Sequence, residues 1–359
     1  MLRQQWNALV YQMRCPEIFF THEWALAVHR AYYASTNALL MLAYEQDSLV
    51  GVAALATDRF QREATFLAGN TADYCDFVSL PERRLEFVRL VLHELQRQNI
   101  PLVVLANLPA DSATSPALSL AADTYRHSLF SRPAFRCAQV VFSSMPERAL
   151  VRQSVQRKQM TRRHLKAMSK IAPVKMQHSC SWEDIATALP KFEQAHIARF
   201  LSTGRVSNLA RTERRSFLAE LAKLLSKSGW IKLTSLNVGD QPVAWNYGFQ
   251  FASSWFWYMP TFDGAFARFY PGLCLLSKMV EEACENTEVD RVDLGLGDEK
   301  YKGQFATRSR QTLDVTVSAS TARHLKEVLR YHAASAIKSS PPLENCIRRL
   351  LGRPSAGGA

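Results

Sequence analysis

The sequence predicts an α/β fold in which one order of helices and strands occurs twice. Apolar runs are short enough for buried strands, amphipathic helices lie between them, and polar turns separate paired strands. The first half has the order helix, helix, hairpin, strand, helix, strand, helix, strand, and the second half follows it up to the last two elements. This order is typical of mixed α/β domains. We therefore expect two domains, each with a mixed central sheet flanked by helices.

The strongest helix signal in the first half lies at residues 82–99. Apolar Leu85, Val88 and Leu92 stand near helical spacing, and Pro101 follows the helix. The other elements expected in this half are helices at 1–13, 22–34 and 116–125, and strands at 37–43, 49–56, 64–68, 102–106 and 138–142.

The second half repeats this order up to its last two elements, where the final strand precedes the final helix. Residues 230–238 and 243–251 predict a hairpin around the turn Gly239-Asp-Gln-Pro242. The other expected elements are helices at 182–201, 211–228, 271–285 and 324–336, and strands at 254–261, 289–294 and 313–317. We expect a first domain at 1–145, a basic helical linker at 146–178, a second domain at 179–338 and a disordered tail at 339–359.

Much of the net charge of +12 lies in the linker. Between residues 148 and 175 there is no acid, and the basic residues are Arg148, Arg152, Arg157, Lys158, Arg162, Arg163, Lys166, Lys170 and Lys175. Such a segment favours an anionic partner, such as the pyrophosphate of coenzyme A, an acyl carrier protein, a phospholipid surface or RNA. A solvated helix between two domains is the alternative.

Composition excludes several classes of protein. The seven cysteines contain no CxxC pair, which argues against a zinc ribbon or a redox dithiol and favours reduced thiols in the cytoplasm. The first residues do not resemble a signal peptide, and no apolar run reaches the ~18 residues of a spanning helix. No histidines have metal-ligand spacing, and there is no nucleophile elbow or Walker loop. We expect no metal.

The most informative stretch is the turn at residues 293–305, which follows an apolar strand. It contains three glycines, three acids, two lysines and a tyrosine. Turns at strand ends that carry many titratable groups are typical of binding or catalytic sites. Alternatively, Gly295 and Gly297 only shape the turn, Asp298 caps a helix that starts at Glu299, and Tyr301 packs beneath it.

Four stretches of the second half together resemble a known family. They are Val243-Ala-Trp-Asn-Tyr-Gly-Phe249, Phe256-Trp-Tyr-Met-Pro-Thr-Phe-Asp263, Tyr270-Pro-Gly-Leu-Cys-Leu-Leu276 and Asp293-Leu-Gly-Leu-Gly-Asp-Glu-Lys-Tyr-Lys302. They resemble the GNAT acyltransferases, in the branch of the CelD-like acetyltransferases associated with cellulose biosynthesis. That branch is distantly similar to the FemX-type peptidyltransferases, which carry two GNAT copies. The element order agrees, so the resemblance implies tandem GNAT-like domains.

The resemblance implies transfer of an acyl group from acyl-CoA, acetyl-CoA or longer, to an amine or hydroxyl. The acceptor would be a small molecule, a sugar, or an envelope or polysaccharide precursor, and it would attack the thioester directly. An acyl carrier protein is a possible donor. Two alternatives stay open. One is an aminoacyl transferase that uses charged tRNA, with the basic linker as its RNA contact. The other is a non-catalytic scaffold in exopolysaccharide assembly.

The donor is expected at the start of the helix that begins after Tyr270. A proline in the first turn, Gly272 and free backbone N–H groups suit a pyrophosphate there. The usual GNAT pattern is matched only by Arg268 and Gly272, with Leu273 following. In the first half Glu82 stands near the corresponding helix start and would repel a phosphate, so we expect one donor site. A plain helix start is the alternative.

Within the turn, each ionisable residue has a candidate role. Asp293 would orient an amine or act as the base if burial raises its pKa, and Glu299 is a second candidate base. Tyr301 would protonate the leaving thiolate, and Lys300 or Lys302 would contact phosphate.

The acceptor site is expected beside an aromatic wall. Trp245, Tyr247 and Tyr258 lie on adjacent strands and are candidates for holding a sugar ring or an acyl chain. Core packing is the alternative for these side chains. Asp263, just past a strand, and Asp73, in the first half, are expected to line the acceptor pocket.

Overall fold

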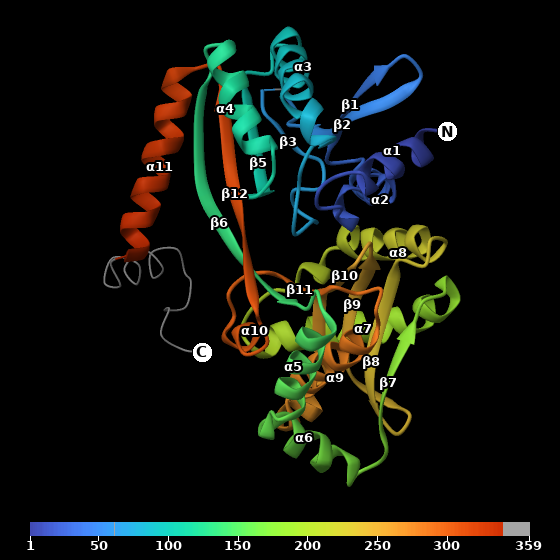
Figure 1. The fold of residues 1–359 in the computed structure, drawn as a ribbon. Helices are drawn as coiled ribbons and strands as arrows, with labels where there is room; N and C mark the ends of the chain where they lie inside the picture. The colour runs from blue at the N-terminus through green and yellow to red at the C-terminus, as the bar shows by residue number, and fades with distance from the viewer. Residues whose placement is uncertain (61, 340–359) are drawn as a thin grey trace.

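The computed structural model describes residues 1–60 and 62–339, with side chains to residue 333. One mixed sheet runs through both halves of the chain, and helices flank it (Figure 1). This is the mixed α/β class that the sequence predicts. The tail expected at 339–359 lies, apart from its first residue, outside the described residues.

The sheet order is β1-β2-β3-β5-β12-β6-β11-β10-β9-β8-β7, with β4 paired to β2. The strands are β1 (Asn37–Glu45), β2 (Ser48–Thr57), β3 (Ala64–Phe66), β4 (Val78–Ser79), β5 (Leu102–Pro109), β6 (Ser128–Val141), β7 (Val174–Ser179), β8 (Ile231–Val238), β9 (Gln241–Phe251), β10 (Ser254–Phe262), β11 (Arg291–Leu296) and β12 (Arg308–Ser318).

The α-helices are α1 (Leu2–Tyr11), α2 (His22–Tyr32), α3 (Arg84–Arg97), α4 (Thr114–Thr124), α5 (Met145–Gln156), α6 (Gln159–Ser169), α7 (Trp182–Ser202), α8 (Thr212–Ser226), α9 (Pro271–Glu285), α10 (Lys300–Gly303) and α11 (Thr321–Ser339). Short 3-10 helices are η1 (Ile18–Phe20), η2 (Pro81–Arg83), η3 (Asn208–Ala210) and η4 (Gly264–Phe269).

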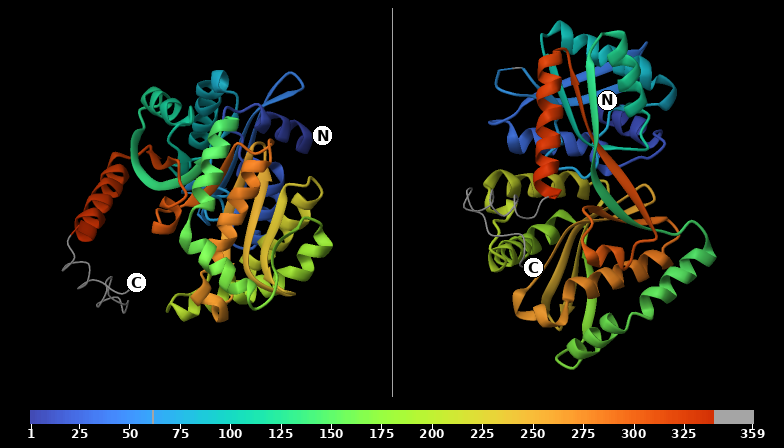
Figure 2. Two further views of the ribbon diagram at one scale, coloured as in Figure 1. Left: turned by 60° about the horizontal axis from the view of Figure 1, so that its bottom comes forward. Right: turned by 90° about the vertical axis from the view of Figure 1, so that its left-hand side faces the viewer.

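Strands β6 and β12 join the two halves of the sheet. They are the long crossing strands of Figures 1 and 2, and they pair antiparallel from Ser128–Ser318 to Gln139–Arg308. At its end β6 also pairs with β11 of the second half, while β12 pairs with β5 of the first. The sheet is therefore continuous.

Two expectations about elements differ from the structure. The strand expected at 313–317 lies among the strands of the first half, because Val315 and Val317 are buried in the core that the first half shares. The linker is two helices, α5 and α6, followed by β7, whose partner is β8. The predicted domain boundaries are not tested by these pairings and stay a prediction.

One hydrophobic cluster draws side chains from both halves. Trp24 of α2 is fully buried, and its ring centroid lies 5.6 Å from that of Phe217 and 5.3 Å from that of Phe249. Its indole N–H donates to the hydroxyl of Thr71 at 3.1 Å. Trp24 therefore ties the first half to α8 and β9 of the second.

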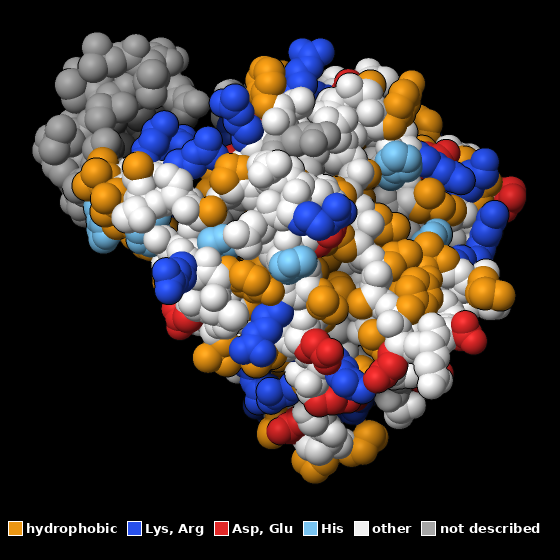
Figure 3. All heavy atoms as spheres, turned by 90° about the horizontal axis from the view of Figure 1, so that it is seen from above, with side chains coloured by type: hydrophobic (Ala, Val, Ile, Leu, Met, Phe, Trp, Pro, Cys, Tyr) orange, Lys and Arg blue, Asp and Glu red, His pale blue; other side chains and the backbone are white. Residues whose placement is uncertain are grey.

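The basic segment is an exposed feature of the second half. Arg162, Arg163, Lys166 and Lys170 are exposed at α6, and none has an ion-pair partner among the described residues. The opposite face of the molecule, viewed from above in Figure 3, mixes Lys and Arg with hydrophobic and acidic side chains. Unpaired positive charge is thus concentrated along α6.

Trp24→Ala tests whether the halves share one core. We expect it to lower the free energy of unfolding by about 3–5 kcal/mol, because it empties a large buried site. Urea denaturation followed by fluorescence and by circular dichroism should show a single, earlier transition. Leu90→Ala, at an exposed position of α3, is the control and should change little. Two separate transitions would contradict a shared core.

Candidate functional site

In the second half, the neighbouring strands β10 and β11 stop pairing part-way along their length. These parallel strands pair from Ser254–Arg291 to Phe256–Asp293, and the pairing ends there. The pairing of β10 with β9 is also irregular, between Phe256 and Met259. The turn that follows β11 therefore lies beside backbone groups that form no regular strand pairing.

Asp293 lies at this divergence and is completely buried. One carboxylate oxygen, Oδ2, accepts hydrogen bonds from the hydroxyl of Tyr74 at 2.9 Å and from Nε2 of Gln139 at 2.7 Å. The other, Oδ1, accepts from the backbone N–H of Gly295 at 2.9 Å. Three donors from three segments hold this carboxylate, so the geometry favours a positioning role over proton transfer.

Asp73 of the first half approaches the same turn. Gly295 has φ of +71°, and a Cβ placed on it would lie 2.6 Å from Oδ2 of Asp73. Only glycine leaves room for this carboxyl. Burial, together with the charge of Asp293, raises the pKa of Asp73 to about 7, although Lys302 and Arg214 oppose the shift. Asp73 is therefore the carboxyl of the site that titrates near neutral pH.

Tyr301 is held by Trp257 of β10. The indole N–H donates to the Tyr301 hydroxyl at 3.2 Å, and because an indole can only donate, the tyrosine oxygen accepts. The Tyr301 O–H is therefore left to donate elsewhere. Burial raises the pKa of Tyr301 to about 12, so the hydroxyl keeps its proton at neutral pH.

Lys302 fixes the shape of the turn. It is buried, and its ammonium donates to the carbonyl of Leu296 at 2.6 Å and lies 2.8 Å from Oε2 of Glu299. Glu299 itself is exposed. The ammonium that the sequence suggests for phosphate binding is thus engaged within the turn, and its charge also acts on Asp73.

The start of α9 lies at a separate edge of the site. Tyr270 has φ of 48° and is exposed, and its ring centroid lies 5.1 Å from that of His164 on α6. Arg268 is exposed, and Leu273 packs in the core of the second half. A Cβ added at Gly272 would meet only Phe262, at 3.5 Å, so a side chain fits here.

Arg199 of α7 lies between these two edges. Its guanidinium carbon lies 4.7 Å from the centroid of the Phe262 ring, and Nη1 donates to the carbonyl of Pro260 at 3.2 Å. Burial lowers the pKa of Arg199, and the neighbouring Tyr301 and Glu299 oppose this shift. Sequence reasoning missed Arg199, although a basic residue on a largely apolar helix was a usable signal.

Arg214, which sequence reasoning also missed, lies where the site borders the first half. It is buried on α8 and donates to the hydroxyl of Tyr258 at 2.7 Å, while Tyr258 donates to the carbonyl of Thr71. Gln139, on β6, had no sequence signal, because nothing in the chain indicates that β6 lies beside β11.

Core packing accounts for the placement of two of the predicted acceptor residues. Trp245 and Tyr247 are buried, and the Tyr247 hydroxyl donates to the carbonyl of Leu218 at 2.7 Å. Asp263 accepts from the backbone N–H of Ala265 at 2.9 Å and caps η4. Tyr258 and Asp73, in contrast, lie together with the turn.

Comparisons with known proteins found a similarity in the second half of the chain. Residues 155–303 match the family model described as "Acetyltransferase (GNAT) domain". Residues 155–303 are thus similar to GNAT acetyltransferase domains. No curated protein matches the sequence.

Solved structures extend the similarity beyond the GNAT domain. FemX is 10% identical, with a TM-score of 0.60 over 91% of this chain and 98% of that one. The C-terminal domain of a "Putative Lysylphosphatidylglycerol Synthetase" from Agrobacterium fabrum is 11% identical, with a TM-score of 0.57 over 93% and 95%. A conserved protein of unknown function from Bacteroides thetaiotaomicron is 9% identical, with a TM-score of 0.59 over 88% and 96%. At these identities the similarity concerns the fold alone, and it confirms the predicted fold class across most of the chain.

Two searches of the described residues were negative. No helix combines the length and the apolar character needed to cross a membrane. No group of three or more His, Cys, Asp or Glu side chains could hold a metal ion.

Asp73→Asn tests the electrostatics of the site. A folded pKa of about 7 lies above the usual aspartate value of 3.8. Between these values the folded state binds the proton more tightly than the unfolded state, so stability falls as pH rises from about 4 to about 7. The variant lacks the titrating carboxyl, so it should not show this decrease in stability with rising pH. We expect its Tm relative to wild type to rise from pH 4 to pH 8. Asp47→Asn, in an exposed turn, is the control; equal behaviour of the two variants would contradict the raised pKa.

Proposed function

We propose that this protein is an acyltransferase that moves an acyl group from acyl-CoA to an amine, or a hydroxyl, of a small-molecule, sugar or envelope precursor. The observation that carries the proposal is the joint site at the end of β11. There the first half contributes Asp73, a carboxyl whose pKa is about 7. It faces the turn of the GNAT-like domain, in which the O–H of Tyr301 is free to donate.

The proposed reaction needs no protein nucleophile. The acceptor nitrogen attacks the thioester carbonyl, a C–N bond forms, and the C–S bond breaks. Asp73, as carboxylate, accepts the proton that the amine loses, and Tyr301 donates its proton to the departing sulfur. A base with a pKa near the working pH and an acid that stays protonated are the pair that this chemistry requires. Asp293 orients the site through Tyr74 and Gly295.

The donor would bind at the start of α9, in the second half. No side chain caps this helix, and Pro271 has no N–H, so the N–H of Gly272 and the helix dipole would favour a phosphate. Exposed Arg268, and the cations of α6 beside Tyr270, would add to the attraction. Arg199 lies on the route from this edge to Tyr301.

Gly272→Glu tests the donor site. We expect it to weaken acetyl-CoA binding by at least about tenfold, because a carboxylate would face the phosphates at the helix start. Calorimetry with acetyl-CoA and longer acyl-CoAs gives the affinity. Gly272→Gln is the matched control, since it adds nearly the same volume without charge. Equal affinity of the two variants for acetyl-CoA would contradict the assignment of the donor site to this helix.

Tyr301→Phe tests the proposed acid. With a panel of amines as acceptors and release of free CoA as the readout, we expect kcat to fall by roughly 100-fold. The KM for the donor should change little, because the ring and its packing remain. Leu90→Ala serves as the surface control. An unchanged kcat would exclude Tyr301 as the acid, and no turnover of any thioester would favour the scaffold alternative.

A second candidate is an aminoacyl transferase that takes its acyl group from charged tRNA. The exposed cations along α6, which border the start of α9, favour a large polyanion. Binding of tRNA should then weaken steeply with salt. Tight, salt-sensitive tRNA binding with no acyl-CoA binding would replace the first candidate by the second.

A further inference from the structure

Helix α6 carries a row of positive charge on the surface of the second half. Arg163, Lys166 and Lys170 are exposed, and their spacing of three and four residues places them on one side of the helix. Arg162 lies beside them and is also exposed. None of these four residues, here called the basic row, has an ion-pair partner in the part of the chain that the structure describes. The row therefore presents charge that the protein itself does not balance.

The opposite side of α6 is fixed against the core. Thr161 and Met168 are buried, and Leu165 packs against the hydrophobic cluster of the second half. The thiol of Cys274, on α9, contacts the carbonyl of Thr161 at 3.9 Å. Because this side is held inward, the basic row has to point away from the protein.

Exposed apolar side chains accompany the basic row along one flank of the helix. Met160, in the first turn of α6, is exposed, and Ile171, in the turn that follows α6, is more than half exposed. Tyr270, also more than half exposed, lies beside the middle of the helix, because its ring centroid is 5.1 Å from that of His164. His164 follows Met160 by four residues and precedes Ile171 by seven, which is the spacing of one helix flank. Large apolar side chains exposed together mark an interaction site.

The position of α6 leaves this surface open. It is the lowest helix in Figure 1, and helices α1 to α4 of the first half lie at the other end of the molecule. A flat surface can therefore lie along α6 without meeting the first half.

We propose that α6 and the neighbouring Tyr270 bind the surface of a bilayer that contains anionic phospholipids. The basic row lies at the level of the headgroups, and Met160, Ile171 and Tyr270 enter the boundary between headgroups and acyl chains. Amphipathic helices with a basic polar face bind bilayers in this way, and each cation near an anionic surface strengthens the binding. A nucleic acid would use the cations, but Met160 and Ile171 would gain nothing from its phosphates. The exposed apolar flank therefore favours the bilayer.

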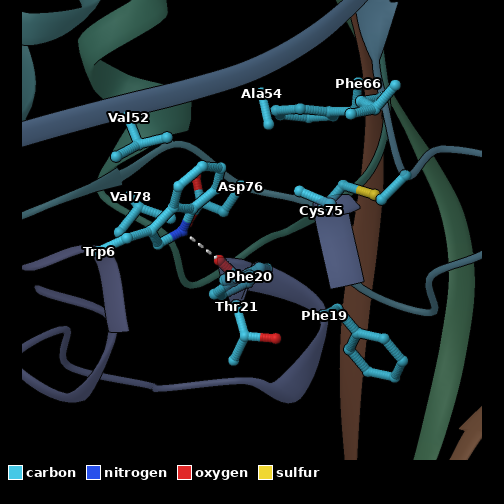
Figure 4. A pocket seen from close by; sticks show the side chains of 13 residues that line it. Trp6, Phe19, Phe20, Thr21, Val52, Ala54, Phe66, Cys75, Asp76 and Val78 are labelled. Carbon is cyan, nitrogen blue, oxygen red and sulfur yellow. Dashed lines mark hydrogen bonds between the residues drawn. The ribbon is translucent and has the colours of Figure 1, made fainter. Parts of the chain in front are cut away.

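A lipid drawn out of the bilayer would need a cavity for its acyl chains. The cavity in Figure 4 lies in the first half and is lined by Phe66, Val78 and other largely apolar side chains, but it measures about 30 Å³. That is room for about one or two water molecules and none for an acyl chain. We therefore assign α6 to the bilayer surface and not to an extracted lipid.

Sedimentation of the full-length protein with lipid vesicles tests this surface. We expect binding to vesicles made of equal parts of phosphatidylglycerol and phosphatidylcholine. Binding to phosphatidylcholine alone should be at least about tenfold weaker, because the basic row requires an anionic lipid. Equal binding to both kinds of vesicle, or binding to neither, would overturn the proposal. Vesicle binding is measured without any acyl transfer, so its outcome is independent of the proposed reaction.

Arg163→Gln combined with Lys166→Gln tests the basic row. We expect about 30-fold weaker binding to the anionic vesicles, because two cations close to the bilayer are lost. Lys223→Gln combined with Lys227→Gln is the matched control, since both lysines are exposed at the end of α8 and the net charge falls by the same amount. The control should lose little affinity, because charges beyond about 10 Å are screened. Equal losses in the two double variants would contradict a site on α6.

Ile171→Ser tests the apolar flank and separates a bilayer from a nucleic acid. We expect about tenfold weaker vesicle binding, because a large aliphatic side chain no longer enters the bilayer boundary. Leu120→Ser, at an exposed position of α4 in the first half, is the control and should bind vesicles as the wild type does. Unchanged vesicle binding in Ile171→Ser would overturn the bilayer as the partner. Tight, salt-sensitive binding of tRNA would then assign the basic row to a nucleic acid.

Discussion

The buried carboxylate of Asp293 joins the two halves of this protein. It accepts hydrogen bonds from Tyr74 of the first half, from Gln139 on the connecting strand and from Gly295 in its own turn. A fully buried charge costs several kcal/mol unless it is paired or well hydrogen-bonded. These donors, therefore, have to stay in place for the fold to be stable, and they fix the turn after β11 against the first half. The position of the proposed acid Tyr301 follows from this constraint.

Further buried charges lie beside this carboxylate. Glu17 is completely buried and lies 2.6 Å from Arg310 and 3.1 Å from Arg291, so it links η1 to β12 and β11. The Arg310 guanidinium carbon lies 4.7 Å from the centroid of the Tyr74 ring, and Tyr74 donates to Asp293. This chain of contacts holds the ring of Tyr74 in place. Burial and the charge of Asp293 raise the pKa of Asp73 to about 7, so Asp73 is the carboxyl able to exchange a proton near neutral pH.

The sequence allowed the elements to be predicted, but not the way in which the halves join. Periodicity located α3 and α9, and the turns located the hairpins, because those signals are local. The pairing of β12 with β5 and β6 connects residues about 170 to 215 positions apart, and no local pattern encodes it. For the same reason Asp293 was a good site candidate while its partners Gln139 and Tyr74 carried no signal for that contact. Trp245 and Tyr247 were predicted to line the acceptor site but are buried in the core. An aromatic residue on a strand gives the same sequence pattern in a pocket wall and in a core.

The central claim is that the two halves form one site in which Asp73 is the proton acceptor and Asp293 the anchor. Carboxyl-carbon NMR of protein labelled at aspartate tests it without knowledge of the acceptor. We expect one aspartate resonance to titrate with a pKa of about 7. This titration should be absent in Asp73→Asn. Its pKa should be lower in Asp293→Asn, because a neighbouring negative charge is removed. A titration of Asp73 near pH 4 in the wild-type protein would contradict the account.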